Sequence, residues 1–269
     1  MILAIIPRVP IDPSVKPGAL AYAMRALGRD DPPAAFLLDG ARFHRTAVVK
    51  HDFWAATAFY QANDGRRAVA KINRREPFCG IDLAWIGRWL CRREVRFYTA
   101  LRDLGNVPAV LGRIGRTGFV HAYIPGRPLS RDEKVPDSFF DELRRLFTEI
   151  HRRRIAYVDA NKPQNILLGE DGKPYLIDFQ ISYDLHELGD WPGNRAILRR
   201  LQQADDYHIL KHKRKMRPDQ LTPEERASAE RRGWFIRLHR LLTRPYFLLR
   251  RRTMKKLRDS GKLLPEGSK

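Results

Sequence analysis

Three short segments between residues 43 and 73 mix apolar and polar positions in a strand-like pattern. Each segment contains β-branched residues, and Asn63-Asp64-Gly65 separates the last two. An Asp-Gly pair between β-rich segments is a hairpin signal, because both residue types tolerate positive φ. The pattern predicts a three-stranded antiparallel meander, with strands in HRTAVVK (44–50), WAATAFYQ (54–61) and RRAVAKIN (66–73).

Helical periodicity begins after this meander. Apolar residues recur at near-helical spacing from Ile81 to Leu104, and an amphipathic helix is expected from Phe139 to Arg153. Strand-like pieces lie between the two helices, at Val110–Ile114 and Gly118–Tyr123. Strands with one helix, then a linker, then mostly helices indicate the α+β class with two lobes.

The same pattern divides the chain into four segments. Prolines and weak periodicity predict an irregular leader with one short helix, Ala19–Leu27. A small antiparallel-sheet lobe and a mainly helical lobe follow, and then a basic helical extension in which Thr222-Pro223-Glu224-Glu225 is a strong helix start. The predicted boundaries are 1–35 for the leader, 36–123 and 124–210 for the lobes, and 211–269 for the extension.

Composition supports a globular protein with a real core, because 43% of the 269 residues are hydrophobic. The only two cysteines, Cys79 and Cys91, exclude a disulfide framework and a cysteine-rich zinc site, and they are expected to be buried thiols. The apolar run at the start, MILAIIPRVP, is too short for a signal peptide or a membrane span. We therefore expect a cytoplasmic protein.

Charge is extreme and uneven. The formal net charge is +20, and residues 211–269 hold 19 Lys or Arg against 6 Asp or Glu. Such an extension favours an anionic partner. From Trp234 onward, arginines alternate with bulky apolar groups. Three interpretations stay open: a helix packed on the second lobe, a segment on an anionic membrane surface, or a nucleic-acid contact, which no recognised motif supports.

Residues 151–182 carry most of the candidate chemistry. Two short apolar strands, Asn165–Leu168 and Pro174–Ile177, are joined by Gly169-Glu170-Asp171-Gly172, which has the composition of a hairpin turn. Asn165 opens the first strand and Asp178 follows the second, so the hairpin brings both to one end. An amide oxygen and a carboxylate suit Mg²⁺, a hard cation that is usually shared with substrate phosphates.

This segment resembles the catalytic and metal loops of protein kinases and their relatives, His-Arg-Asp-x-x-x-x-Asn followed by Asp-Phe-Gly. The thirteen positions from Asn165 to Asp178 match the spacing of that family, and the residues upstream, His151 and Tyr157, fit the approach to a catalytic aspartate at Asp159. The resemblance implies a protein-kinase-like two-lobe fold over about residues 43–210.

Two positions depart from the family pattern. Asp159 lies six positions before Asn165 instead of five, so that strict counting puts Ala160 in the catalytic place. Asp159 is favoured because alanine can accept no proton. Gln180 stands where the family usually has glycine. RIO-type kinases and lipopolysaccharide-core sugar kinases also depart from glycine there, which indicates an atypical, minimal branch.

The resemblance implies ATP-binding residues upstream. Ala68-Val69-Ala70-Lys71-Ile72 is similar to the strand whose lysine holds the ATP phosphates, and Glu94, 23 residues later, is the expected partner on a helix. Asp82 is the alternative partner but is expected to cap that helix. No glycine lies in the expected phosphate cover, so either residues 54–57 supply backbone N–H groups or nucleotide affinity is weak. Tyr123 lies in a stretch that resembles the adenine hinge.

Together these features imply an ATP- and Mg²⁺-dependent phosphotransferase in which Asp159 deprotonates an acceptor hydroxyl. The segment after Asp178 is short and lacks a recognisable Ala-Pro-Glu element, so a sugar of a lipid-linked glycan at the inner membrane face is the expected acceptor, by fold-level analogy. The alternatives are a RIO-like Ser/Thr protein kinase, and a pseudokinase scaffold that binds membrane or nucleic acid.

Overall fold

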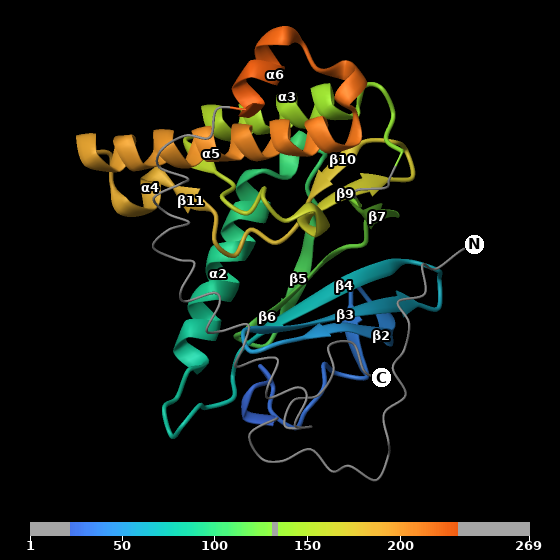
Figure 1. Cartoon of the computed structure of the whole chain (residues 1–269). Coiled ribbons are helices and arrows are strands. Elements are labelled where there is room, and N and C mark those ends of the chain that lie inside the picture. The colour runs from blue at the N-terminus through green and yellow to red at the C-terminus, as the bar shows by residue number, and fades with distance from the viewer. Residues whose placement is uncertain (1–21, 131–133, 231–269) are drawn as a thin grey trace, which may run out of the picture. The chain divides into compact units, whose positions relative to one another are not determined.

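The computed structural model describes residues 22–130 and 134–230, and these form two compact units. The N-terminal unit contains residues 22–92 and 111–122, and the C-terminal unit contains residues 93–110 and 123–230. We describe each unit by itself. The class is α+β, as expected, with strands first and most helices later (Figure 1).

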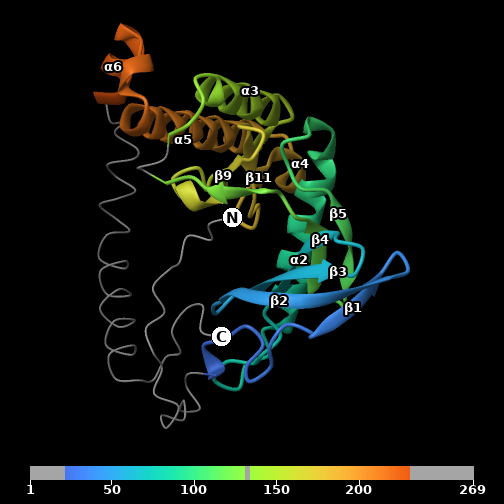
Figure 2. The same ribbon diagram turned by 90° about the vertical axis from the view of Figure 1, so that its right-hand side faces the viewer.

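The N-terminal unit is built on a six-stranded sheet in the order β1-β2-β3-β4-β6-β5 (Figure 2). Strands β2, β3 and β4 form the predicted antiparallel meander, and Gly65 takes a φ of 86° in its last turn. The sequence does not predict strand β1, which has only four residues, AFLL. Its pairing with β2 is what makes this short segment a strand and not a loop. The bounds are β1 Ala35–Leu38, β2 Ala41–His51, β3 Ala55–Ala62, β4 Arg67–Asn73, β5 Val110–Ile114 and β6 Gly118–Ala122.

One face of this sheet buries the core of the unit. Small residues on β3 and β4, such as Ala58 and Ala70, leave room for the large rings of Phe43 and Tyr60. The hydroxyl of Tyr60 donates to the carbonyl of Pro33 at 2.7 Å, which satisfies a polar atom that burial would otherwise penalise. Because side chains alternate along a strand, Lys71 lies on the opposite face from Ala70.

Helix α2 spans Ala84–Ala100, shorter at both ends than the predicted Ile81–Leu104. Asp82 caps it as expected, since its Oδ1 accepts from the N–H of Ala84 at 2.8 Å. A Cβ on Gly87 would lie 1.9 Å from the carbonyl oxygen of Arg74, so this position requires glycine. Just before the helix the prediction of two buried thiols is wrong for Cys79, which is exposed; Cys91 is buried. Cys79 has a φ of 51° in a surface turn, where its side chain finds no core to enter.

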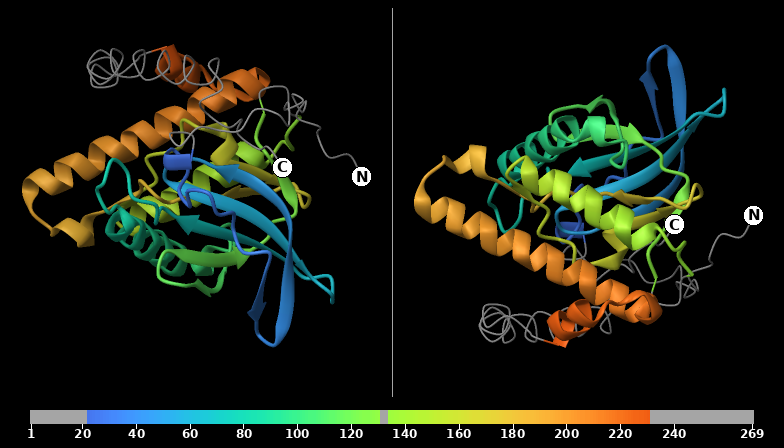
Figure 3. Two further views of the ribbon diagram at one scale, coloured as in Figure 1. Left: turned by 90° about the horizontal axis from the view of Figure 1, so that it is seen from below. Right: turned by 90° about the horizontal axis from the view of Figure 1, so that it is seen from above.

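The C-terminal unit combines a helical layer with short strands. Helices α3 and α5 lie side by side (Figure 3), and the amphipathic pattern of α3 buries Leu143, Phe147 and Ile150. Strand β9 pairs with β10 on one side and β7 on the other, while β8 pairs with β11. The bounds are α3 Phe139–Arg152, α4 Leu185–Leu188, α5 Pro192–Met216, α6 Pro223–Glu230, β7 Gly126–Pro128, β8 Ile155–Ala156, β9 Ile166–Gly169, β10 Pro174–Leu176 and β11 Tyr183–Asp184.

The start of the basic extension is ordered. Helix α5 runs without a break across position 211, and α6 begins as predicted: Thr222 Oγ1 accepts from the N–H of Glu225 at 3.1 Å, and Glu225 Oε2 accepts from the N–H of Thr222 at 3.2 Å. Lys213 and Arg144 both contact Glu225, which ties α6 to α5 and α3. The four-segment division itself stays a prediction.

Several expectations fall on residues that the structure does not describe. Residues 1–21 of the predicted leader, which include the first three residues of its short helix, lie outside the described residues, as does the arginine-rich segment from Trp234 onward. Within the rest of that predicted helix, residues 22 and 23 are helical, whereas residues 24–27 form turns and a bend. Among the helices of residues 22–130 and 134–230, none has both the length and the apolar character needed to cross a membrane.

Candidate active site

A buried carboxylate on α5 anchors the loop that carries the candidate base. Asp205 is fully buried, and its two oxygens accept from the backbone N–H groups of Tyr157 at 2.7 Å and Val158 at 2.8 Å. His151 Nε2 lies 3.3 Å from the same carboxylate. Burial raises the pKa of Asp205, although His151 and the two N–H donors oppose that rise. The backbone is therefore fixed immediately before Asp159.

A strained turn at Val158 directs the next side chain. Val158 has a φ of 69°, which is rare for a β-branched residue, and the N–H of Asp159 donates to the carbonyl of Tyr157 at 2.8 Å. This is a γ-turn of the strained, positive-φ type. Such a conformation persists only where its surroundings over-determine it, and here the carboxylate of Asp205 holds the N–H of the strained residue itself.

Asp159, and not Ala160, contacts the other site residues. Its Oδ2 accepts from Asn165 Nδ2 at 2.7 Å and from Lys162 Nζ at 2.8 Å. Two backbone turns, each closed by a 3.1 Å hydrogen bond, fold the longer loop back from Asp159 through Lys162 to Asn165. Ala160 is fully buried, and its carbonyl oxygen lies 2.8 Å from His212 Nε2. The extra residue is thus accommodated without separating Asp159 from Asn165.

The environment of Asp159 suits a proton acceptor. Burial raises the pKa of its carboxyl, the hydrogen bond and charge of Lys162 lower it, and the negative charge of Asp178 raises it, with a net rise. A carboxylate with a raised pKa is a stronger base than a solvated one. The contribution of Asp178 also means that the two carboxylates lie near each other.

The end of the β9–β10 hairpin brings Asn165 and Asp178 together, as the sequence predicts. The N–H of Ile177 donates to the carbonyl of Asn165 at 3.1 Å, so Asp178 follows directly beside Asn165. Asp178 has a φ of 64°, and its N–H donates to the hydroxyl of Tyr98 at 3.1 Å. The hydroxyl of Tyr157 donates to the carbonyl of Ile177, which fixes the hairpin end to the catalytic loop.

These residues fit a magnesium ion shared with phosphates. Because Asn165 donates through Nδ2, its Oδ1 remains an acceptor, and Asp178 supplies a carboxylate. Within the described parts of the chain no group of three or more His, Cys, Asp or Glu could hold a metal. A site with two protein ligands therefore needs further oxygens, which is how Mg²⁺ is commonly bound beside nucleotide phosphates.

Arg93 on α2 holds the segment that follows Asp178. Its guanidinium donates to the carbonyls of Gln180 at 2.8 Å and Ser182, and its Nε lies 3.1 Å from the carboxylate of Glu187. Gln180 is not among the residues with positive φ, so its backbone does not require glycine. The departure at this position therefore brings no strain.

The candidate nucleotide residues of the N-terminal unit lie on the sheet face opposite the core. Lys71 on β4 is buried and stands opposite Phe119 on β6. Burial, with a smaller contribution from the charge of Lys71, lowers the pKa of the neighbouring His121 to about 4. Glu94 on α2 is fully buried, but it belongs to the C-terminal unit, so its pairing with Lys71 stays a prediction.

The expected phosphate cover between β2 and β3 is closed by its own side chain. Asp52 Oδ1 accepts from the N–H of Trp54 at 2.8 Å and of Ala55 at 2.9 Å, so these two donors are not offered outward as the sequence suggests. Burial alone would raise the pKa of Asp52, but Lys50 and the two N–H donors outweigh it and the pKa is lowered. The carboxylate is therefore charged at neutral pH and caps its own turn.

Comparison with known proteins identifies the fold. No family model matches the chain, and no curated protein matches it. Among solved structures, the BubR1 kinase domain aligns with a TM-score of 0.50 at 12% identity, over 70% of this chain and 65% of that one. The chain has a protein-kinase-like fold.

Two structures of the Rio2 kinase from Chaetomium thermophilum also match this kinase-like chain, both at 19% identity. The ADP/Mg²⁺-phosphoaspartate complex gives a TM-score of 0.48 over 63% of this chain and 55% of that one. The other gives 0.46, over 66% and 59%. The kinase-like chain thus spans less than two thirds of the length of all three structures, and these likenesses concern the fold alone. The resemblance to sugar kinases stays a prediction.

Tyr123, the predicted adenine-hinge residue of the kinase-like chain, lies in the connection between β6 and β7 and is half-buried. Close backbone contacts at Pro125 and Gly126 determine the path of this connection. A Cβ on Gly126 would lie 2.5 Å from the carbonyl oxygen of Leu168, and the N–H of Glu170 donates to the carbonyl of Pro125 at 2.9 Å. The role of Tyr123 in nucleotide binding stays a prediction.

Sequence reasoning misses three residues of the kinase-like site: Lys162, Asp205 and Arg93. Lys162 carries a signal, since a lysine three positions after a candidate base on a turn-forming loop can reach back to it. The only sequence signal for Asp205 is that an acidic residue falls on the apolar side of a helix. The sequence around Arg93 indicates an ordinary surface ion pair, and nothing local distinguishes this arginine from its neighbours.

Proposed function

We propose that this protein is an ATP- and Mg²⁺-dependent phosphotransferase that acts on a hydroxyl acceptor. The observation that carries the proposal is the arrangement around Asp159, a buried carboxylate with a raised pKa that is bonded to Asn165 and Lys162 and lies near Asp178. Buried acids of this kind cluster at catalytic sites. The kinase-like fold supports the same chemistry.

Each site residue has a separate role in this reaction. Asp159 takes the proton of the acceptor hydroxyl as its oxygen bonds to the γ-phosphorus of ATP and the bond to the β–γ bridging oxygen breaks, which releases ADP. Asn165 orients Asp159 through its amide, and Lys162 supplies positive charge beside it. Asp178 and Asn165 Oδ1 would hold Mg²⁺, which neutralises charge on the phosphates. Lys71, with Glu94 as its partner and Tyr123 at the adenine, serves ATP in this proposal.

We further propose a sugar hydroxyl, soluble or lipid-linked, as the acceptor. Only six residues separate Asp178 from α4, and Arg93 bonds the carbonyls of two of them, Gln180 and Ser182, so little chain is left to receive a peptide. A RIO-like protein kinase is the competing proposal. Transfer of label from γ-labelled ATP to lipid, protein and sugar fractions separates the two, and label found only in protein would exclude the sugar acceptor.

The test of phosphotransfer itself is Asp178→Asn, compared with Asp171→Asn in the exposed hairpin turn. A neutral amide cannot offset the charge of the metal, so magnesium-dependent ATP turnover should be abolished in the first variant and kept in the second. Circular dichroism checks that both are folded. Equal turnover in the two variants would remove this mechanism, and ATP binding without turnover in the wild type would indicate a pseudokinase.

A further inference from the structure

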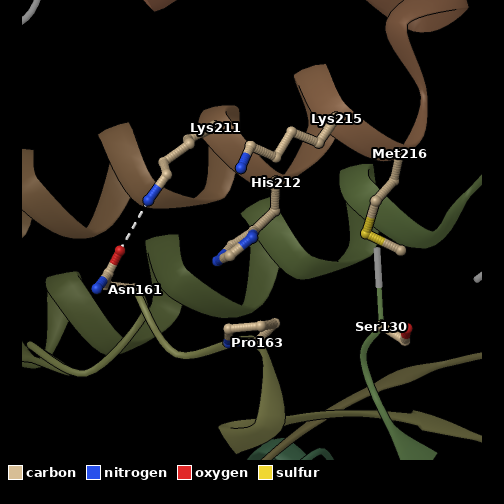
Figure 4. Close-up of a pocket in the computed structure, with 7 residues that line it drawn as sticks. All are labelled: Ser130, Asn161, Pro163, Lys211, His212, Lys215 and Met216. Atoms are coloured by element: carbon tan, nitrogen blue, oxygen red, sulfur yellow. Dashed lines mark hydrogen bonds between the residues drawn. The ribbon is translucent and has the colours of Figure 1, made fainter. Parts of the chain in front are cut away.

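A small basic pocket lies beside the catalytic loop in the C-terminal unit (Figure 4). The last turns of α5 form one wall of the pocket, with Lys211, His212 and Lys215. Asn161 and Pro163, from the loop after Asp159, form the other wall. The empty space is about 350 Å³, a value that includes the part open to solvent. The pocket is large enough for one small polar group.

The pocket is prepared for an anion. Among the described residues that line it none is acidic, and Lys211 and Lys215 lie four positions apart, hence on one face of α5. Like charges at this spacing repel each other on the helix surface. The negative end of the helix dipole favours cations in a last turn, but it does not require two of them to face a concave surface.

This pocket is connected directly to the catalytic loop. Lys211 Nζ donates to Asn161 Oδ1 at 2.8 Å, and His212 Nε2 lies 2.8 Å from the carbonyl oxygen of Ala160. Asn161 is two residues after Asp159, so their Cα atoms are at most about 7 Å apart. The loop that is one residue longer than in the family pattern thus supplies a wall of the pocket.

We infer that this pocket binds a phosphate group already present on the sugar acceptor. The inference rests on the proposed function, because it places the acceptor's hydroxyl at Asp159 and its phosphomonoester in the pocket that Asn161 of the same loop lines, between Lys211 and Lys215. A phosphomonoester carries nearly two negative charges at pH 7 and three acceptor oxygens, which match two ammonium groups. Soluble sugar phosphates and phosphorylated lipid-linked sugars share this chemistry.

Direct binding tests the pocket without any catalytic activity. Inorganic phosphate is titrated into the full-length protein with EDTA at about 0.15 M salt, where long-range attraction by the basic extension is screened. Lys211→Gln/Lys215→Gln should bind at least about tenfold more weakly than wild type, because two charged hydrogen bonds are lost. The control Lys173→Gln/Arg199→Gln removes the same charge from exposed positions elsewhere in this unit and should bind as wild type does.

Equal phosphate binding by the pocket variant and wild type overturns the inference, as does equal weakening by the control. Lys215→Gln alone guards against a folding defect, because the exposed Lys215 side chain can be changed while the bond between Lys211 and Asn161 is kept; it should weaken phosphate binding at least about threefold. Unchanged binding in a folded Lys215→Gln protein likewise overturns the two-lysine pocket.

Acceptor kinetics then test what the pocket is for. A hexosamine phosphate should be phosphorylated with a KM at least about tenfold below that of the unphosphorylated hexosamine, and the pocket variant should erase this difference. Vesicles that contain a phosphorylated glycolipid are assayed in parallel, and they distinguish a lipid-linked acceptor from a soluble one.

Phosphate binding without turnover of any acceptor overturns the proposed function while the pocket stands. Equal KM values, or a preference for a phosphopeptide, overturn the acceptor subsite while phosphotransfer stands.

Discussion

The two units of this protein use their backbone N–H groups in opposite ways near the candidate chemistry. In the C-terminal unit, Asp205 accepts two backbone N–H groups from the loop and so positions Asp159, whose carboxylate remains part of the site. In the N-terminal unit, Asp52 accepts two N–H groups of the cover turn, which occupies donors that a phosphate would use. The difference indicates that the loop of Asp159 is arranged so that its carboxylate stays in the site, whereas the expected phosphate cover is closed by its own side chain.

Burial shifts pKa values in both units. It raises the pKa of Asp159 and Asp205 in the C-terminal unit. It lowers the pKa of His51 and His121 in the N-terminal unit, and that of His208 in the C-terminal unit, each to about 4. These histidines are therefore neutral at physiological pH in both units, and the units differ instead in how a carboxylate uses the backbone N–H groups of its loop. Four experiments probe this contrast.

Asp159→Ala should have the largest effect. Loss of a positioned base should lower kcat for phosphotransfer by at least about a hundredfold with little change in ATP affinity. Single-turnover kinetics and nucleotide binding measure the two quantities separately. A silent Asp159→Ala substitution would show that strict counting to Ala160 is right and that the protein is a pseudokinase.

Asp205→Ala should follow, because it leaves two backbone N–H groups buried without their acceptor. We expect a loss of about 3 kcal/mol in the free energy of unfolding, measured by urea titration, and a fall in kcat as the loop relaxes. Its sequence neighbour Asp206, whose side chain is largely exposed, provides the matched control as Asp206→Ala. Similar losses in both variants would mean that the helix, and not the anchoring carboxylate, is responsible.

The pH dependence of stability tests the N-terminal unit. The folded-state pKa of His121 is depressed to about 4. The unfolded chain therefore binds more protons as the pH falls below about 6.5. The stability from a neutral His121 is full above that value and is lost towards pH 4. Between pH 7 and 4.5, His121→Gln should lose about 2 kcal/mol less than wild type in urea titrations, with His44→Gln on the exposed side of β2 as control. Parallel curves for wild type and His121→Gln would contradict the neutral, buried histidine.

Asp52→Ala should have the smallest effect and the opposite sign. Removing the carboxylate releases the N–H groups of Trp54 and Ala55, and a net hydrogen bond contributes about 0.5–1.5 kcal/mol, so the KM for ATP should fall about two- to tenfold. Asp64→Ala in the next turn, between β3 and β4, removes the same charge at an exposed site and should leave the KM unchanged. A higher KM in Asp52→Ala would mean that the turn needs its internal cap to bind ATP.

The local sequence pattern was sufficient to predict the strands of the meander, the hairpins and most helix starts, because each of these depends on residues a few positions apart. The β9–β10 hairpin is predicted from two apolar segments around a Gly-containing turn, and its length alone brings Asn165 and Asp178 to one end. The capping box at Thr222 and the cap at Asp82 are equally local. For the same reason the α+β order of elements can be predicted before any tertiary contact is known.

Only the tertiary structure decided how Asp159 is held and what the extra loop residue does. Asp205 lies 48 positions from Tyr157, and Lys211 lies 50 positions from Asn161, so neither contact leaves a periodic or compositional signal. The strain at Val158 is tolerated because Asp205 reaches it across the unit. Asp52 shows that a local contact can also be missed, because its two bonds span only two and three residues. The same sequence is compatible with a carboxylate that caps its turn and with one that points to solvent. Only the backbone conformation distinguishes the two.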